Sequence, residues 1–192
     1  MFIDETSAYV GQSREYSWGS SKERVYDTRP KGKKERVSLI AATTPNGIMA
    51  EQALVIPGTV NKNAFLAFLE TTLLPTLAKD SVLVMGPNEV RTQRNNWSVH
   101  HGDDVRKLVE DYGCELLYLP TYSPDLVLGK TAPSGPARNP IEHLFAKLKS
   151  FIRALRPETT AALVQAFCQA VKTLTPQNIF NSFQHCGYDV GQ

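Results

Sequence analysis

The sequence contains no hydrophobic run approaching the ~20 residues that a membrane-spanning helix needs, which argues against a membrane protein. Its three cysteines, Cys114, Cys168 and Cys186, match neither a zinc pattern nor a disulfide framework, which favours a reducing cytoplasm. Because Asp4 interrupts the apolar start of the chain at once, we expect no signal peptide. The remaining class is a globular chain of 192 residues, enough for one domain with a full core.

The net charge is also small, +2, and does not by itself indicate a nucleic-acid partner. The positive charges are nevertheless gathered into two clusters. One cluster contains Arg29, Lys31, Lys33, Lys34 and Arg36, and the other contains Lys147, Lys149, Arg153 and Arg156. Clusters of this kind are usually solvated surface, but two of them beside an acidic site would bind the phosphates of DNA.

Apolar runs and turn signals predict the order of strands and helices. The expected strands are Met1–Ile3, a hairpin partner in Tyr9–Trp18, Val37–Thr44, Ile48–Ile56, Ser81–Met85 and Glu115–Leu119. The expected helices are Asn61–Pro75, Asp103–Tyr112, Pro140–Leu155, Pro157–Leu174 and Pro176–Cys186, and the expected loops are Gly19–Arg36, Gly86–Arg94 and Val127–Arg138. This order predicts an α/β fold, a mixed sheet of three antiparallel strands and then parallel strands, flanked by helices. It is typical of the ribonuclease-H-like fold.

Two acids lie where such a fold would place functional groups. Asp4 follows the apolar start of the first strand, at or near its end, where a carboxylate is either solvated, paired or bound to a metal ion. Glu142 lies in the first turn of a helix that Asn139 caps and Pro140 begins. Taken alone, Glu142 is better explained as an acid of the capping turn that the helix dipole favours.

The stretch around Glu142 carries a resemblance to a known family. It consists of LPTYSPDL, ending at Leu126, and NPIEHLFAKLK, beginning at Asn139, with Val127–Arg138 between them. Joined, the two halves resemble the third acidic block of bacterial insertion-sequence transposases in the mariner-like superfamily, in particular the IS-six-thirty group. FIDET, VSLIAATTPNG and NIFNSFQHCGY resemble other blocks of the same family, so the resemblance covers nearly the whole chain.

The resemblance implies DNA transposition by a DDE-type catalytic domain that cuts and joins DNA strands. Asp4 and Glu142 would be metal ligands, holding Mg²⁺ or Mn²⁺ in a two-metal site. The implied partners are DNA, as transposon ends and target, and a second copy of the chain in a homodimer. The implied location is the cytoplasm, on the nucleoid when the protein is bound to DNA. We expect residues 1–192 to form a single catalytic domain, without the family's N-terminal helix-turn-helix module.

The sequence departs from the family at its second acid. That acid should follow the Ser81–Met85 strand directly, but Gly86 stands there, and the family's following residues resemble the segment that starts at Asn96. Without Val127–Arg138, the spacing from Asn95 to Glu142 matches the family. Asn95 is therefore predicted to occupy the position of the lost acid.

Three outcomes of this loss stay open. Glu89 could replace the acid from its loop, or Asp103 or Asp104 could do so, although both read as N-terminal acids of a helix. Alternatively nothing replaces the acid, and the protein is an inactive transposase remnant or a non-enzymatic DNA-binding or oligomerising protein. His100, His101 and His143 are expected near the site, where a surface or hydrogen-bonding role is at least as plausible as metal binding.

Overall fold

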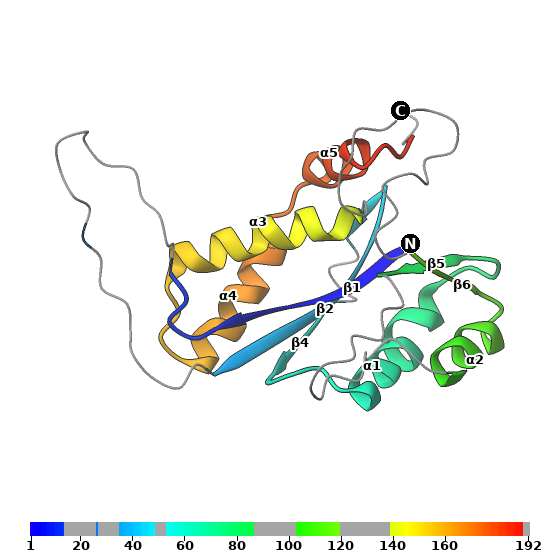
Figure 1. The fold of residues 1–192 in the computed structure, drawn as a ribbon, viewed down its shortest axis with the longest axis horizontal. Helices are drawn as coiled ribbons and strands as arrows, with labels where there is room; N and C mark the ends of the chain where they lie inside the picture. The colour runs from blue at the N-terminus through cyan, green and yellow to red at the C-terminus, as the bar shows by residue number, and fades with distance from the viewer. Residues whose placement is uncertain (14–25, 27–34, 49–52, 87–102, 120–138, 190–192) are drawn as a thin grey trace.

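Six strands form one mixed sheet in the computed structural model, which describes residues 1–13, 26, 35–48, 53–86, 103–119 and 139–189 (Figure 1). The strands are β1 (Phe2–Tyr9), β2 (Arg36–Thr44), β3 (Gly47–Ile48), β4 (Leu54–Pro57), β5 (Val82–Met85) and β6 (Glu115–Tyr118). Their order is β3-β2-β1-β5-β6, with β4 also paired to β2. The β2 pairings are antiparallel, and β1, β5 and β6 are parallel, so the predicted mixed sheet is confirmed.

The first strand differs from its prediction. β1 has eight residues, and Asp4 is its third, so this acid lies inside the strand rather than near its end. The strand continues because each residue from Phe2 to Tyr9 pairs with a residue of β2. Tyr9 therefore ends β1 and does not begin a separate hairpin strand, and residues 14–18 of that expected partner lie outside the described residues.

Helices cover both faces of this sheet, and most begin where a capping residue is found. They are α1 (Lys62–Phe68), η2 (a π-helical turn, Leu69–Leu73), η3 (a 3₁₀ turn, Leu74–Thr76), α2 (Asp103–Asp111), α3 (Pro140–Leu155), α4 (Thr160–Lys172) and α5 (Pro176–His185). The helix expected at Asn61–Pro75 is divided into α1, η2 and η3, and the start of α4 is displaced from its prediction. Helix α4 begins at Thr160 because the Thr159 hydroxyl accepts the N–H of Ala162, at 3.1 Å.

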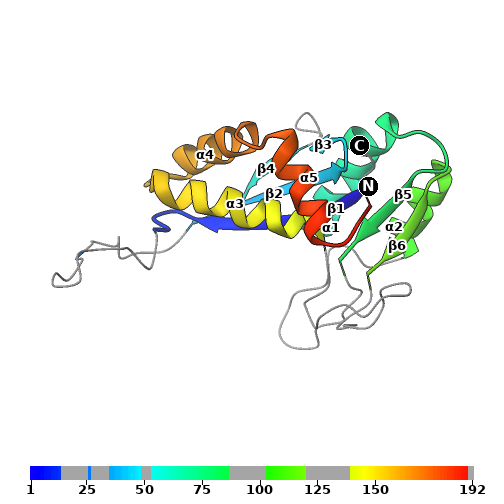
Figure 2. The ribbon, with the colours of Figure 1, turned by 90° about the horizontal axis from the view of Figure 1, so that it is seen from above.

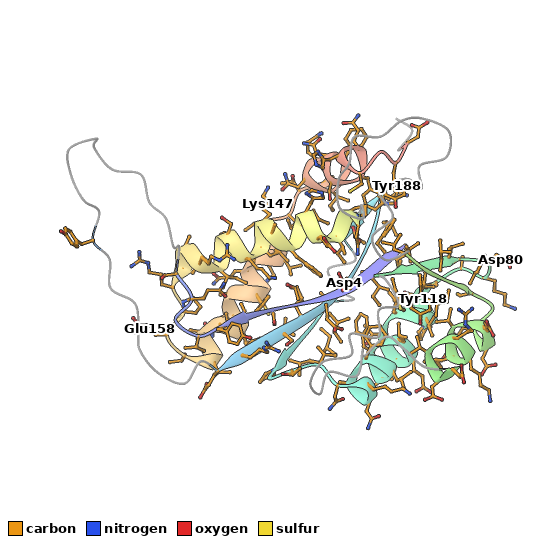
Figure 3. The ribbon with its side chains drawn as sticks, in the orientation of Figure 1. Asp4, Asp80, Tyr118, Lys147, Glu158 and Tyr188 are labelled. Atoms are coloured by element: carbon orange, nitrogen blue, oxygen red, sulfur yellow. The ribbon has the colours of Figure 1, made fainter. Side chains whose placement is uncertain are left out.

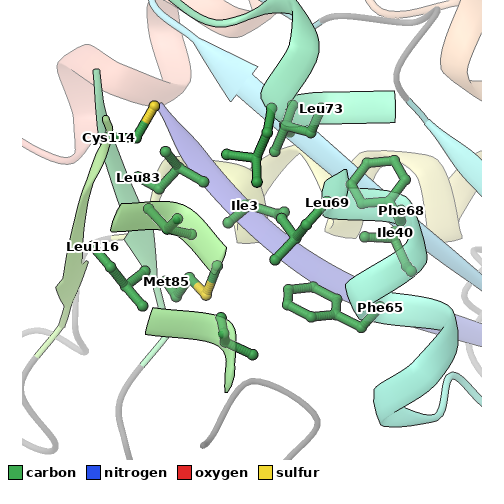
Figure 4. Packing of buried hydrophobic residues seen from close by; sticks show 14 of the residues in the cluster. Ile3, Ile40, Phe65, Phe68, Leu69, Leu73, Leu83, Met85, Cys114 and Leu116 are labelled. Carbon is green, nitrogen blue, oxygen red and sulfur yellow. The ribbon is translucent and has the colours of Figure 1, made fainter. Parts of the chain in front are cut away.

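The two helical layers have separate cores. Figures 1 and 2 show α1 and α2 on one side of the sheet and α3, α4 and α5 on the other. In β1 the side chains alternate between them. Ile3 lies in the core with α1, whereas Ala8 lies in the core that contains Ile152 of α3. Asp4, labelled in Figure 3, is an even number of residues from Ala8 along β1 and shares its face. Figure 4 shows the first of these cores, where Ile3 meets Phe65 and Met85.

The loops expected beside the site lie almost wholly beyond the described part of the chain. Of Gly86–Arg94 only Gly86 is described, and all of Val127–Arg138 is outside it, so both loop assignments stay predictions. Within the described ranges, no helix is long and apolar enough to cross a membrane.

Candidate metal centre

The strand β1 and the helix α3 bring Asp4 and Glu142 to the same side of the sheet. Asp4 lies directly opposite Ala41 of β2, and Ala41 is part of the core beneath α3 and α4. Its backbone neighbour Glu5 donates its N–H to Asp4 Oδ1, at 2.8 Å, which fixes the orientation of that carboxylate. Glu142 is exposed in the first turn of α3, where the partial positive charge of the helix N-terminus favours a carboxylate.

Three contacts hold the first turn of α3 in place. The side chain of the buried Asn139 accepts the N–H of Ile141 at 3.3 Å, and its carbonyl accepts the N–H of Glu142 at 3.1 Å. The hydroxyl of Ser182, buried in α5, donates to the carbonyl of Pro140. The position of Glu142 therefore depends on a cap within α3 and on a contact from a helix near the end of the chain.

Lys149 connects the two acids electrostatically. It lies two helical turns after Glu142 on α3 and is half-buried. Burial lowers the pKa of its ammonium, and the neighbouring Arg153 lowers it further, while the carboxylates of Asp4 and Glu142 act in the opposite direction. Asp4 and Glu142 therefore both lie near enough to Lys149 for their charges to act on its ammonium.

The chain leaves β5 next to these acids. Ile3 of β1 pairs with Met85 of β5, so Gly86 is the next position beside Asp4. Phe2 and Val84 pack into the same core, which shows that paired residues of β1 and β5 share a face, and a side chain at position 86 would therefore share the face of Asp4. A Cβ atom added to Gly86 would meet no heavy atom of the described residues within 4 Å, its chain neighbours apart.

The residue predicted to replace the second acid lies outside the described residues. Asn95 belongs to the undescribed segment 87–102, as do Glu89, His100 and His101, so their roles stay predictions. Among the described residues, no group of three or more His, Cys, Asp or Glu side chains could hold a metal ion.

Asp103 and Asp104 begin α2, whose buried residues pack on the face of the sheet opposite α3. Asp104 pairs there with Lys62 of α1, at 2.5 Å, and the hydrogen bond and charge of Lys62 lower the pKa of Asp104. The structure thus brings neither acid to Glu142. This agrees with their reading as N-terminal acids of a helix.

His143 lies beside Glu142 in the sequence and contacts α5. Its ring meets that of His185 edge to face, with centroids 4.7 Å apart and an interplanar angle of 79°. This ring contact joins α3 to α5 at the start of α3, which favours the surface role over metal binding.

Two residues at this site were missed by sequence reasoning. Lys149 was assigned to a basic cluster, although its spacing of seven residues from Glu142 already predicts a shared helical face. Ser182 gave no signal, because its contact with Pro140 depends on the packing of α5 against α3.

Comparison with known proteins supports the fold and the family. The sequence model of a family described as DDE superfamily endonuclease matches residues 1–164. The fold is similar to Mos1 transposase in a paired-end complex with the left transposon end (TM-score 0.60, 17% identity) and in the strand transfer complex (0.61, 17%). A Mos1 mariner paired end complex with Mn gives 0.60 at 19% identity. No curated protein matches the chain.

The alignments with these three structures cover 96% of this chain but only 51% of the Mos1 chain. The chain therefore spans about half the length of the solved proteins that it matches. Identities this low establish similarity of fold, and they confirm the ribonuclease-H-like architecture predicted from the order of strands and helices.

Proposed function

Because the chain belongs to the DDE superfamily of endonucleases, we propose that it is the catalytic domain of a DNA transposase, which cuts and joins DNA strands with divalent metal ions. The observation that supports this best is the placement of Asp4, on the face of β1 that α3 covers, and of Glu142, in the first turn of α3, on the same side of the sheet. The joined motif around Glu142 favours the bacterial insertion-sequence branch, the IS-six-thirty group, within that family.

The residues present suit Mg²⁺ or Mn²⁺. Both ions prefer carboxylate and water oxygens, and Asp4 and Glu142 offer carboxylate oxygens at a solvent-accessible edge of the fold. The comparison structure that contains Mn supports the same choice. When bound, such ions activate the attacking oxygen and stabilise the oxygen that leaves the phosphodiester.

The chain's own residues position this chemistry. Asp4 is oriented by the N–H of Glu5, and Glu142 is fixed by the cap and the α5 contact of its helix. Arg153 and Lys149 place positive charge along α3, where the phosphates of a bound strand would be attracted. We assign binding and orientation of the DNA backbone to this helix.

Loss of activity is the second candidate, and Gly86 favours it. The position beside Asp4 that could carry another carboxylate has no side chain. With two acids instead of three, the loss of preorganised charge would lower the cleavage rate by about a hundredfold or more. We therefore propose a transposase domain that cleaves DNA weakly. The alternative is an inactive transposase remnant that retains DNA binding.

The proposed partners are transposon-end DNA, target DNA and a second copy of the chain. The Mos1 complexes with transposon ends support the first of these. We further propose that residues 1–192 act as one catalytic domain, and that the protein works on DNA in the cytoplasm.

Nicking of supercoiled plasmid DNA, with Mg²⁺, Mn²⁺ or EDTA, tests the proposal. We expect slow nicking that requires metal and is abolished by Asp4→Asn and by Glu142→Gln. Asp104→Asn is the matched control, because its carboxylate is bound to Lys62 on the other face of the sheet. Nicking that survives both site variants would refute the assignment. Salt-sensitive DNA binding with no metal-dependent nicking would support the DNA-binding remnant.

A further inference from the structure

The position of Lys149 on α3 carries an inference beyond the metal ligands themselves. Seven residues separate it from Glu142, which places both on one face of the helix, about 10 Å apart along its axis. Side chains on a helix lean toward its N-terminus, so the long stem of Lys149 extends back toward Glu142. It is half-buried, whereas Lys147, two residues earlier on α3 and on another face of the helix, is exposed and bonded to Asn178 of α5.

The strand beneath the helix brings the second acid to the same place. α3 runs alongside β1 in the same direction, with Phe2 and Leu144 in one core at the start and Gly11 donating its N–H to the carbonyl of Pro157 at the end (Figure 1). Asp4 lies between these two ends, on the face that α3 covers. Lys149 therefore lies on the same helical face as Glu142 and on the same side of the sheet as Asp4.

We propose that Lys149 is an internal counter-cation for Asp4 and Glu142, and that a divalent metal ion must displace its ammonium to bind them. Two carboxylates that share a site repel each other, and a cation between them offsets this repulsion. Once a divalent ion occupies the site, the same ammonium becomes a like charge and opposes binding. Lys149 would thus stabilise the metal-free protein and weaken its affinity for metal. The inference rests on the proposed function, because it takes these acids as metal ligands.

Calorimetric titration of the full chain with Mn²⁺ tests this competition. Lys149→Met removes the charge and keeps an apolar side chain of similar length, so we expect Mn²⁺ to bind on the order of tenfold more tightly, as for removal of one neighbouring charge. Lys149→Arg keeps the charge and should bind Mn²⁺ as the unmodified chain does. Lys147→Met is the control for loss of a positive charge elsewhere on the same helix, and it should leave the affinity unchanged.

Thermal unfolding in EDTA and in Mn²⁺ gives an independent readout. Without metal, Lys149→Met should unfold at a lower temperature than the unmodified chain, because the two carboxylates lose their counter-charge, and Mn²⁺ should close or reverse that difference. A purely structural lysine would leave the same difference in both buffers, and that result would overturn the inference. If Lys149→Met does not fold, Lys149→Gln provides the same comparison.

The two proposals fail in different ways. If Asp4→Asn and Glu142→Gln abolish Mn²⁺ binding but Lys149→Met binds no more tightly than the unmodified chain, only the role of Lys149 is refuted. If the unmodified chain binds no Mn²⁺ that depends on these two acids, the proposed metal-dependent function is refuted together with it.

Discussion

Replacing Gly86 with aspartate should add a third carboxylate beside the two that Asp4 and Glu142 already provide. Neighbouring strands lie ~4.8 Å apart, so a carboxylate at position 86 would lie beside that of Asp4 and on the same face. The substitution requires no rearrangement of described atoms, because the added Cβ has no neighbour within 4 Å and the backbone at Gly86 is not in the left-handed region. The change therefore adds charge without adding strain.

The expected effects have opposite signs with and without metal. At ~5 Å and an effective dielectric constant near 20, two carboxylates repel by about 3 kcal/mol, which solvent screening reduces toward ~1 kcal/mol at this accessible edge. In a domain of this size, that loss lowers the melting temperature by roughly 2–4 °C in EDTA. Mn²⁺ should reverse the loss, since a third carboxylate becomes a ligand, and plasmid nicking should increase by about a hundredfold.

Gly86→Asn is the matched control, because it has the same size without the charge. It should leave nicking near the level of the unmodified chain. A folded Gly86→Asp protein that neither binds Mn²⁺ more tightly nor nicks faster would refute the position assigned to the missing acid. Nicking by the unmodified chain at the rate of Gly86→Asp would show that another carboxylate, such as Glu89, already completes the site.

A second repair follows from the sequence alone. Deleting Gly86–Arg94 and Val127–Arg138 and changing Asn95→Asp restores the spacing of the family blocks. We expect metal-dependent nicking to increase in this variant and to disappear when Glu142→Ala is added. If only the Gly86→Asp variant gains activity, the acid belongs at the end of β5 and the register through Asn95 is wrong.

Three further predictions concern the support of the site. Asn139→Ala should cost about 1 kcal/mol of stability in thermal unfolding and also slow nicking, because it loosens the first turn of α3. Thr175→Ala, at the cap of α5, is the control and should cost about as much stability without slowing nicking. Ser182→Ala should lower stability by about 1–3 kcal/mol and slow nicking, because it leaves the Pro140 carbonyl without this donor; unchanged nicking would show that α5 does not position Glu142. Lys62 lowers the pKa of Asp104, so this carboxylate stabilises the fold above its unfolded pKa of 3.8, and the stabilisation is lost as the pH falls through the folded pKa. The melting temperature of Asp104→Asn should be slightly below that of the unmodified chain at neutral pH and equal to it in acid.

Local signals were sufficient to predict most of the fold. The turn at Pro45 and Asn46, the strand ending at Met85 and the helix beginning at Pro140 were each predicted from turn, apolar or capping residues and are confirmed. The length of β1 was not predictable in this way. Glu5 and Ser7 are polar, and the strand continues through them because β2 supplies a partner for each. Such pairing depends on residues far away in the sequence.

The sequence placed the two candidate ligands on the right elements, but it did not predict their surroundings. Asp4 and Glu142 were selected by their motifs, whereas the convergence of both on Lys149 depends on α3 running alongside β1. Sequence spacing placed the lost acid at Asn95, but the register of the sheet leaves Gly86 beside Asp4. A motif records which residues follow each other, and the sheet determines which of them become neighbours in space.

The central position of β1 also affects how the protein reaches its folded state. β1 pairs with β2 on one side and with β5 on the other, and it lies under α3, so its contacts join segments far apart along the chain. Contacts of large sequence separation form late, because long loops must close before such contacts stabilise the chain. We therefore expect Asp4 and Glu142 to come together late in folding. The proposed metal site would thus be completed only in the last steps of folding.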